Sequence, residues 1–243
     1  MRPDISIVVP AYNEAKNIHH SLLFIKKAVS KRIRNYEIIV VDDGSTDSTF
    51  DEAQKAGKDI RIISYRPNYG KGNALKQGYF ASKGKIVVFL DADLEIPPES
   101  IFKLLDEIKK GYDIVMFSKN NKSSKINFPL YRKMLSKMYY IFVKTLFRLP
   151  ISDTQTGCKA FKKEVLSNVL PYVYTKEFAF DLELLAYAND YGYTLKELPL
   201  EINFKRDKGR IKFKNVCKMA IDTLIIFYRF YIKKIHRWPA DKL

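Results

Sequence analysis

Three carboxylates follow one of the most apolar segments of the chain, at alternate positions. The segment KIVVFLDADLEIPPE (85–99) has six residues suited to a buried strand and then Asp91, Asp93 and Glu95. In an extended chain, side chains at every second residue point the same way, so we expect the three acids to share one face. Because like charges repel, a metal ion, a basic side chain or a ligand must lie between them.

The composition favours a metal held by oxygen ligands. The chain has two cysteines and three histidines, which form no CxxC pair and no cluster with zinc spacing. Carboxylate oxygens suit Mg²⁺ or Mn²⁺, and such ions bridge one or two carboxylates to substrate phosphates. The Asp-x-Asp at 91–93 therefore indicates a diphosphate ligand. The alternative, that the acids cap the next helix or pair with lysines, stays open on sequence alone.

Five short runs rich in β-branched residues must position these acids. They are ISIVVP, YEIIVV, IRIISY, KIVVFL and YDIVMF, spaced by roughly 25–30 residues with helical segments between them. Nearly continuous apolar strands alternating with helices predict an α/β fold with a mainly parallel sheet covered on both faces. Ligands in such sheets bind beyond the carboxyl ends of the strands, where PAYNE (10–14), DDGSTD (42–47) and DAD (91–93) lie.

A glycine-rich segment, GKGNALKQGYFASKGK (70–85), predicts a turn followed by a helix. Its glycine spacing matches neither the P-loop nor the dinucleotide-binding fingerprint. Backbone N–H groups at a helix start, together with Lys71, can nevertheless bind a phosphate. A helix start with a solvated lysine is the alternative.

The net charge of +16 points to an anionic partner. Between Asp113 and Asp153 there is no acidic residue, whereas eight Lys and Arg lie from Lys119 to Arg148. The basic surface therefore belongs to the second half of the chain. No nucleic-acid-binding motif is present, so we expect an anionic membrane surface and no nucleic acid.

Two amphipathic segments fit such a surface. In LYRKMLSKMYYIFVKTLFRL (130–149) the predicted apolar stripe is Tyr131, Leu135, Met138, Phe142 and Leu146. The segment VCKMAIDTLIIFYRFYIKKIHRW (216–238) is interrupted by Asp222 and Arg229, so it lacks the roughly 20 mostly apolar residues that a bilayer span needs. Each segment is either a helix packed on the sheet or a helix at a membrane surface.

Four motifs in order carry a family resemblance. VVPAYNEAKNI, IIVVDDGSTDST, NYGKGNALKQGYFASKG and FLDADLEIPPE resemble family-2 glycosyltransferases with the GT-A fold, over roughly residues 4 to 213. DTQTGCKAFKKEVL (153–166), FAFDLELLAYANDYGY (178–193) and ELPLEINFKRDKGRIKF (197–213) look like the polyprenyl-phosphate sugar synthases. The motifs DTQTG and FAFDLELL look closer to the dolichyl-phosphate glucosyltransferase branch than to the mannosyltransferase branch.

The resemblance implies a reaction and its partners. A hexose would pass from a nucleotide sugar, UDP-glucose first and GDP-mannose second, to a polyprenyl or dolichyl monophosphate. The anomeric carbon would be inverted, and Mg²⁺ or Mn²⁺ would bind the donor diphosphate. Since the acceptor phosphate is already anionic, positioning matters more than a strong general base.

The resemblance also implies roles for single residues. The residues expected to bind the nucleotide sugar are Pro10, Ala11, Tyr12, Glu14, Asp42, Asp43, Lys71, Gly72, Asp91, Ala92 and Asp93. The metal would be held by Asp91, Asp93 and Glu95. The acceptor phosphate would meet Lys119, Arg132, Ser136 and Arg206. The groups closest to the reaction would be Asp93, Asp153, Arg132, Ser136 and Arg206.

The same reasoning predicts the organisation of the chain. Residues 1–213 would form the catalytic domain, with a nucleotide-binding half (1–118) and an acceptor-binding half (119–213). Residues 214–243 would form a basic amphipathic helix at the membrane interface. A strand that begins by Ile5 leaves no room for a signal peptide. The resemblance implies that many relatives continue into transmembrane helices, whereas this chain stops at Leu243, so we expect a peripheral protein on the cytoplasmic face, with a separate membrane subunit as a candidate partner.

Three rival interpretations remain at this stage. A family-2 enzyme could instead glycosylate a polysaccharide or a soluble acceptor. A sugar nucleotidyltransferase would share the fold class, but its glycine-rich entry motif is missing from PAYNEAKN. A basic nucleic-acid-binding or membrane-surface protein without catalysis has no need of acids at strand ends.

Overall fold

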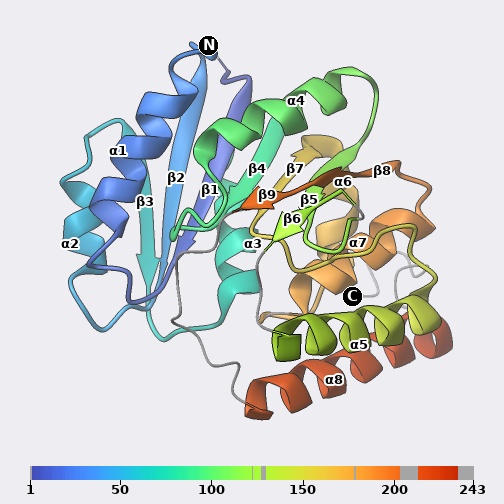
Figure 1. Ribbon diagram of the computed structural model, residues 1–243. Helices are drawn as coiled ribbons and strands as arrows, with labels where there is room; N and C mark the ends of the chain where they lie inside the picture. The colour runs from blue at the N-terminus through green and yellow to red at the C-terminus, as the bar shows by residue number, and fades with distance from the viewer. Residues whose placement is uncertain (1, 122, 127–129, 178, 203–212, 235–243) are drawn as a thin grey trace.

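The computed structural model describes residues 2–121, 123–126, 130–177, 179–202 and 213–234. Seven strands form one sheet in the order β3-β2-β1-β4-β7-β5-β8 (Figure 1). Their bounds are β1 Ile5–Ala11, β2 Tyr36–Asp43, β3 Ile60–Tyr65, β4 Ile86–Leu90, β5 Ile114–Ser118, β7 Cys158–Lys162 and β8 Leu195–Pro199. All neighbours are parallel except β7, which is antiparallel to β4 and β5. The predicted α/β fold with a mainly parallel sheet is confirmed.

Helices cover both faces of the sheet, as the apolar strands require. One face carries α1 (Ile18–Val29), α2 (Thr49–Gln54), the short 3₁₀ helix η1 (Pro98–Ser100) and α4 (Ile101–Lys109). The other carries α3 (Lys71–Ala81), α6 (Lys163–Val169), the 3₁₀ helix η2 (Leu170–Tyr172) and α7 (Phe180–Asp190). Strand β1 serves both cores, because Ile7 packs with the first group and Val8 with the second.

The reversed strand β7 shapes one edge of the sheet. It lies between β4 and β5, and its first residue, Cys158, pairs with Leu90 at the end of β4. The residues that precede β7 therefore arrive at the same edge as the residues that follow β4. In this way the loop that contains Asp153 reaches the same edge of the sheet as Asp91, although 62 positions separate the two residues in the sequence.

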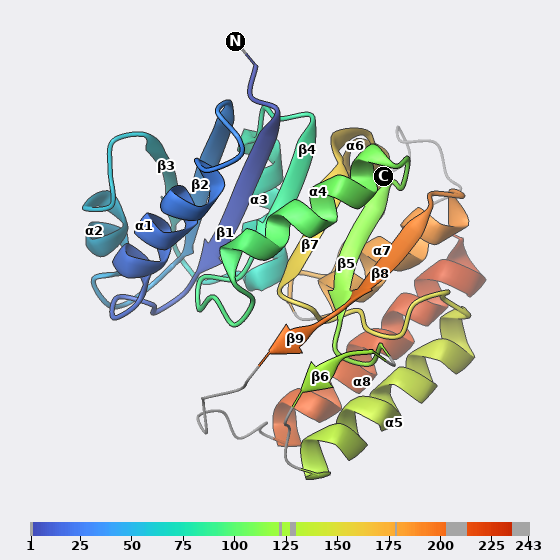
Figure 2. The same ribbon diagram turned by 45° about the horizontal axis from the view of Figure 1, so that its top comes forward.

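Helices α5 (Leu130–Phe147) and α8 (Phe213–Phe227) lie side by side below the sheet in both views (Figures 1 and 2). The π-helical turn η3 (Tyr228–Lys233) continues α8, and the two-stranded sheet of β6 (Lys125–Ile126) and β9 (Glu201–Ile202) lies nearby. The ring of Phe147 meets the rings of Phe227 and Phe230 at 6.2 and 6.0 Å.

The apolar stripe predicted for α5 is confirmed at Leu146, which packs against the core, and is wrong at Met138, while the side chains of Tyr131 and Leu135 lie outside the described residues. The helix buries Val143 and Phe147, whereas Met138 is 64% exposed. The buried face is shifted by one residue, about 100° around the helix, because α5 packs on α8 through Phe147. The helix therefore has two apolar faces, one against α8 and one exposed.

Candidate active site

Three strand ends and one helix start meet at the carboxyl edge of the sheet. Strands β1, β2 and β4 end at Ala11, Asp43 and Leu90, and α3 begins at Lys71. The polar segments after these strands were predicted to share one edge, and the parallel register of β1 with β2 and β4 confirms this.

Asp91 is held between a lysine and a backbone segment. Its Oδ1 lies 2.6 Å from Nζ of Lys71, and its N–H donates to the carbonyl of Gly157 at 2.9 Å. A Cβ on Gly157 would lie 2.4 Å from Oδ2 of Asp91, so only glycine lets the strand β7 approach this closely. Burial would lower the pKa of Lys71, but the charges of Asp91, Asp181 and Asp93 outweigh it and raise the pKa above its ordinary value.

Asp93 and Glu95 do not continue the strand. Leu94 has φ +50°, and its N–H donates to the carbonyl of Asp91, so the chain turns as soon as β4 ends. The expectation of three acids on one extended face is therefore wrong. Oδ1 of Asp93 accepts the N–H of Glu95 at 3.1 Å, and Oε2 of Glu95 lies 3.9 Å from Nζ of Lys119.

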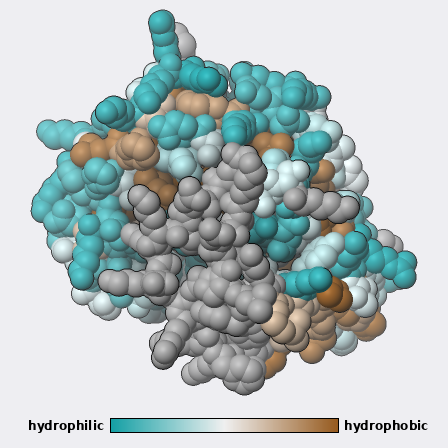
Figure 3. Space-filling view, in the orientation of Figure 1, coloured by the Kyte–Doolittle hydropathy of each residue, from teal (hydrophilic) through white to brown (hydrophobic). Residues whose placement is uncertain are grey.

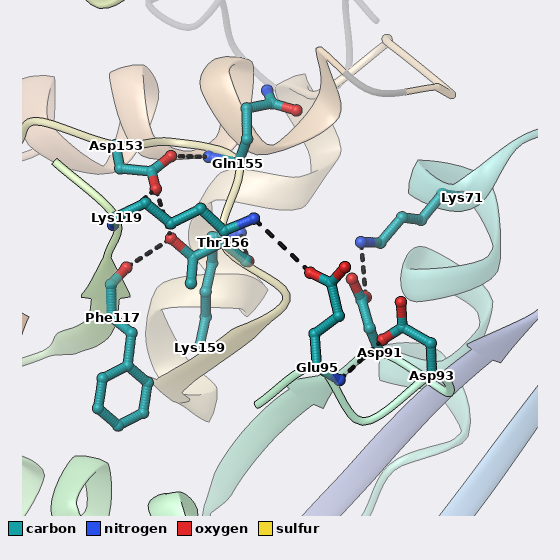
Figure 4. Close-up of polar contacts among 10 residues, drawn as sticks. All are labelled: Lys71, Asp91, Asp93, Glu95, Phe117, Lys119, Asp153, Gln155, Thr156 and Lys159. Atoms are coloured by element: carbon teal, nitrogen blue, oxygen red, sulfur yellow. Dashed lines mark hydrogen bonds and ion pairs between the residues drawn. The ribbon is translucent and has the colours of Figure 1, made fainter. Parts of the chain in front are cut away.

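The carboxylates and two lysines nevertheless form one group. Figure 4 shows Lys71 and Lys119 reaching toward Asp91 and Glu95 from two sides, with Asp93 beside Asp91. Within the described ranges, no three His, Cys, Asp or Glu side chains are grouped as a metal site. A metal here would take most of its ligands from a substrate, which suits Mg²⁺ and Mn²⁺.

Asp42 and Asp43, predicted to contact a base and ribose, are 3% and 2% exposed. Asp42 accepts hydrogen bonds from the N–H of Ser45 at 3.1 Å and the hydroxyl of Ser64 at 2.8 Å. Asp43 accepts the N–H groups of Tyr69 and Gly70 at 3.0 and 2.8 Å. Both carboxylates shape the loops of this edge, and their contact with a nucleotide stays a prediction.

The first motif, PAYNE, begins at the end of β1 on the same edge of the sheet. Tyr12 is exposed, whereas Ala11, like Ala92 after β4, is buried. The N–H of Glu14 donates to Oγ1 of Thr49 at 2.8 Å, which ties the segment from Pro10 to the start of α2.

The start of α3 packs on α7. A Cβ on Gly72 would lie 2.4 Å from Cβ of Phe180, the first residue of α7. The N–H of Asn73 donates to the carbonyl of Lys176 at 3.0 Å. Gly70, with φ +100°, makes the turn that aims Lys71 at Asp91.

Asp153 organises the loop before β7. Its Oδ2 accepts the N–H of Lys119 and the hydroxyl of Thr156, both at 3.0 Å, and its Oδ1 accepts the N–H of Gln155 at 2.8 Å. Glu197 on β8 in turn accepts the N–H of Asp153 at 2.9 Å. The carboxylate of Asp153, which accepts hydrogen bonds from three donors, is therefore arranged to position Lys119.

The predicted acceptor residues are only partly described. The hydroxyl of Ser136 on α5 donates to Oδ1 of Asn120 at 3.4 Å, and Nδ2 of Asn120 donates to the carbonyl of Ser152 at 2.8 Å. Ser136 is thus joined to the segment that carries Lys119. The side chain of Arg132 and the whole of Arg206 lie outside the described residues.

Sequence reasoning missed Thr156, Gly157, Lys159, Asp181 and Glu197. The motif DTQTGCKAFKKEVL contains three of them, but only the reversed direction of β7 brings them to this edge. No local pattern signals Glu197, because its role depends on the pairing of β8 with β5.

Comparison with known proteins agrees with this geometry. Residues 6–170 match glycosyl transferase family 2. A dolichol-phosphate mannosyltransferase of Pyrococcus furiosus is 36% identical over 172 residues, which are 68% of this chain and 48% of that protein. A dolichyl-phosphate beta-glucosyltransferase of Saccharomyces cerevisiae is 30% identical over 262 residues, covering 96% of this chain and 76% of that protein.

Solved structures show the same fold. Glucosyl-3-phosphoglycerate synthase from Mycobacterium tuberculosis, in complex with Mn²⁺, UDP and glucosyl-3-phosphoglycerate, superposes with a TM-score of 0.70 at 23% identity. The match covers 93% of this chain and 80% of that chain, and it shows the GT-A fold. Since the family match extends over most of its length, the chain belongs to glycosyl transferase family 2.

Proposed function

We propose that this protein transfers a hexose from a nucleotide sugar to the phosphate of a polyprenyl or dolichyl monophosphate, with inversion at the anomeric carbon. One observation carries the proposal: a predicted acceptor residue lies against the predicted donor carboxylates. Nζ of Lys119 lies 3.9 Å from Oε2 of Glu95, and the backbone N–H of Lys119 donates to Oδ2 of Asp153. The names of the Pyrococcus and yeast relatives, which act on dolichyl-phosphate substrates, support the acceptor class.

The donor diphosphate would lie at Asp91, Asp93 and the start of α3. The two carboxylates fit Mg²⁺ or Mn²⁺, because they leave most ligand positions to phosphate and water. Such an ion, when bound, stabilises the growing negative charge of the leaving diphosphate. Lys71 and the N–H groups of the first turn of α3 are suited to the same diphosphate. Glu95, which faces Lys119, would be the third carboxylate of the metal site.

The transfer itself needs the acceptor phosphate to be aimed at the sugar. A phosphate oxygen would form the new bond to the anomeric carbon, and the bond from that carbon to the diphosphate would break, releasing the nucleoside diphosphate. Lys119 and Ser136, together with Arg132 and Arg206, would hold the acceptor phosphate. Asp153, with both oxygens bound to donors, would position Lys119 and take no proton.

We favour UDP-glucose over GDP-mannose as donor. The yeast relative named as a glucosyltransferase aligns over 96% of this chain, whereas the Pyrococcus mannosyltransferase aligns over 68%. The motifs DTQTG and FAFDLELL support the same choice.

The lipid tail of the acceptor would be met by α5 and α8. Hydrophobic side chains gather at the lower right of Figure 3, where these helices lie. The exposed large apolar residues of the two helices and η3 include Met134, Met138, Ile141, Ile221, Leu224, Ile225, Tyr228 and Ile232. None of the helices in the described ranges is both long and apolar enough to cross a membrane.

We extend this to a peripheral location at an anionic membrane, on the cytoplasmic face, with a separate membrane subunit as partner. Exposed Lys137, Lys144 and Arg148 stand beside the apolar residues of α5. Each basic residue near an anionic surface contributes about 1 kcal/mol of attraction. Residues 214–243 would form this interfacial element.

We assign donor binding to residues 1–118 and acceptor binding to residues 119–213. The halves share one sheet, because β7 from the second half pairs with β4 from the first. They are functional halves of a single catalytic unit.

A transfer assay tests the proposed function. Purified protein is incubated with dolichyl or polyprenyl phosphate, Mn²⁺ or Mg²⁺, and labelled UDP-glucose or GDP-mannose in separate tubes. We expect metal-dependent label in the organic phase from one donor. Asp93→Asn should abolish it, whereas Asp51→Asn, which alters an exposed residue of α2, should not. Label transferred only to a water-soluble acceptor would contradict the proposal.

A further inference from the structure

Lys159 and Asp181 form an ion pair in which both partners are buried. Nζ of Lys159 on β7 lies 2.9 Å from Oδ1 of Asp181, in the first turn of α7. The two side chains are 3% and 8% exposed, and no other ion pair between described residues leaves both partners below a tenth. Taking two charges out of water is costly, and an apolar pair of similar volume is often as stable. The pair therefore calls for a local role.

Lys159 fixes the segment that touches Asp91. Its Nζ also donates to the carbonyl of Thr156 at 2.5 Å, and Figure 4 shows it ending at that residue. The hydroxyl of Thr156 donates to Asp153, and the next residue, Gly157, accepts the N–H of Asp91. One ammonium group thus holds the loop that positions both Asp153 and Asp91.

Asp181 lies near the start of α3, the helix that begins with Lys71. Gly72 and Phe180 are in close packing contact, so their chain neighbours Lys71 and Asp181 stand at the junction of the first turns of α3 and α7. Negative and positive groups therefore alternate through Asp91, Lys71, Asp181 and Lys159.

From this arrangement we infer that Lys159 and Asp181 are positioning residues for the donor. Asp181 fixes the ammonium of Lys159, and Lys159 keeps Gly157 and Asp91 in register with Lys71. The inference rests on the proposed function for the identity of the donor. It concerns nucleoside diphosphate binding, which can be measured apart from sugar transfer.

If Asp181 acted only through its charge, its replacement would change donor affinity in the opposite direction. Asp181 is negative and the donor is an anion, so removal of its charge alone would tighten donor binding. A positioning role predicts that Asp181→Asn weakens binding, because Lys159, which holds the segment that contacts Asp91, loses its carboxylate. Lys159→Met should also weaken it.

The decisive variant is the double replacement Lys159→Met/Asp181→Leu. It leaves no unpaired buried charge, and we expect a thermal unfolding midpoint close to that of wild type. Calorimetry with UDP plus Mn²⁺ and with GDP plus Mn²⁺ gives the Kd. For the nucleotide that wild type binds, we expect affinity to fall about 10- to 100-fold. The KM for the lipid phosphate should rise less than the Kd for the nucleotide, because Lys119 keeps its contact with Glu95, which does not belong to the loop that Lys159 holds.

The same strand provides a matched control. Lys162 on β7 also pairs with an aspartate, Asp113 at 2.7 Å, and donates to a carbonyl, that of Gly111 at 2.9 Å. It lies at the end of β7 away from Asp91. Lys162→Met should keep the wild-type Kd.

A folded double variant with wild-type Kd would overturn the inference, as would tighter binding by Asp181→Asn. If the double variant does not fold, Asp181→Asn, which preserves the size of the side chain, decides by the direction of its Kd change. Wild-type protein that binds UDP or GDP but transfers no sugar would remove the proposed function, and the Kd comparison would still decide the role of the pair. Wild-type protein that binds neither would remove both.

Discussion

At the scale of single residues, lysines provide the positive charge that the acids after β4 require. Lys71 contacts Asp91, and Lys119 lies near Glu95. The site is therefore preorganised by charge before any ligand enters, and a diphosphate with its cation would exchange one set of ion pairs for another. Preorganised charges of this kind need little rearrangement as the leaving group forms.

Replacing Lys71 tests that exchange. Lys71→Met should raise the KM for the nucleotide sugar about 10- to 100-fold, as expected for the loss of a hydrogen bond between charged groups. Lys71→Arg should recover part of the loss. Lys103→Met, on the exposed face of α4, is the control, and equal kinetics for Lys71→Met and this control would refute the assignment.

Gly157→Ala probes the approach of β7 to Asp91. The new Cβ would lie 2.4 Å from Oδ2 of Asp91, so the carboxylate must move. A displacement of about 1 Å at a reacting centre can lower kcat/KM about 100-fold, and we expect a loss of that order. Steady-state kinetics and thermal unfolding should show lost activity in a folded protein. Activity that falls only in proportion to the folded fraction would contradict this explanation.

At the scale of elements, β7 decides which parts of the chain meet. Its reversed direction places its first residue beside the end of β4 and its last residue beside the start of β4. The loop before β7 thereby joins the site, and Lys162 at the far end of β7 meets Asp113 before β5. One strand thus connects the catalytic edge to the opposite edge.

The contacts of Asp113 predict how stability at that opposite edge depends on pH. Burial would raise the pKa of Asp113, but hydrogen bonds from Lys162 and Thr194 outweigh it and lower the pKa. A carboxyl with a lowered folded-state pKa stabilises the fold above its unfolded value of about 3.9, and this stability is lost as pH falls through the folded value. Urea unfolding between pH 7 and 2 should therefore show a shallower acid decline for Asp113→Asn than for wild type. Parallel curves would contradict the prediction.

The strands β1 to β5 were predictable because each is a nearly continuous apolar run of its own. Strand β7, CKAFK, was not predicted, because Lys159 and Lys162 give it the look of a solvated segment. Lys159 is buried only because α7 supplies Asp181. The place of Asp153 at this edge was expected from the family resemblance alone, since it depends on the direction of β7 and on no local pattern.

The acids after β4 illustrate the same limit at short range. The three carboxylates identified the site. The prediction that they share one face of an extended strand was wrong, because Leu94 adopts φ +50° and turns the chain. A positive φ is uncommon for a residue such as leucine. The sequence therefore located the edge of the sheet and not the arrangement of the side chains on it.

At the scale of the whole molecule, charge and apolar surface coincide. The net charge is +16, and the exposed apolar residues of α5 and α8 lie on one side of the protein (Figure 3). A protein with both features is suited to an anionic bilayer. Electrostatic attraction of this kind weakens as salt screens it.

Vesicle flotation tests the location. We expect binding to anionic vesicles at low salt, weaker binding to neutral ones, and a further loss with Leu224→Asp. The matched control is Leu23→Asp, because Leu23 on α1 is exposed to a similar degree, 42% against 51%, but α1 packs on the opposite face of the sheet. Equal effects of the two variants, or no flotation at low salt, would contradict the assigned surface.

The central claim, that the sugar is transferred to a phosphate, is tested most directly by the bond that the enzyme makes. Purified protein should be given α-linked UDP-glucose, or GDP-mannose, with polyprenyl phosphate in one tube and the unphosphorylated polyprenol in another. The products are analysed by mass spectrometry and by ³¹P and ¹H NMR. We predict a sugar phosphodiester with inverted anomeric configuration in the first tube and no product in the second. A sugar attached to the alcohol, or a product with retained configuration, would contradict the account.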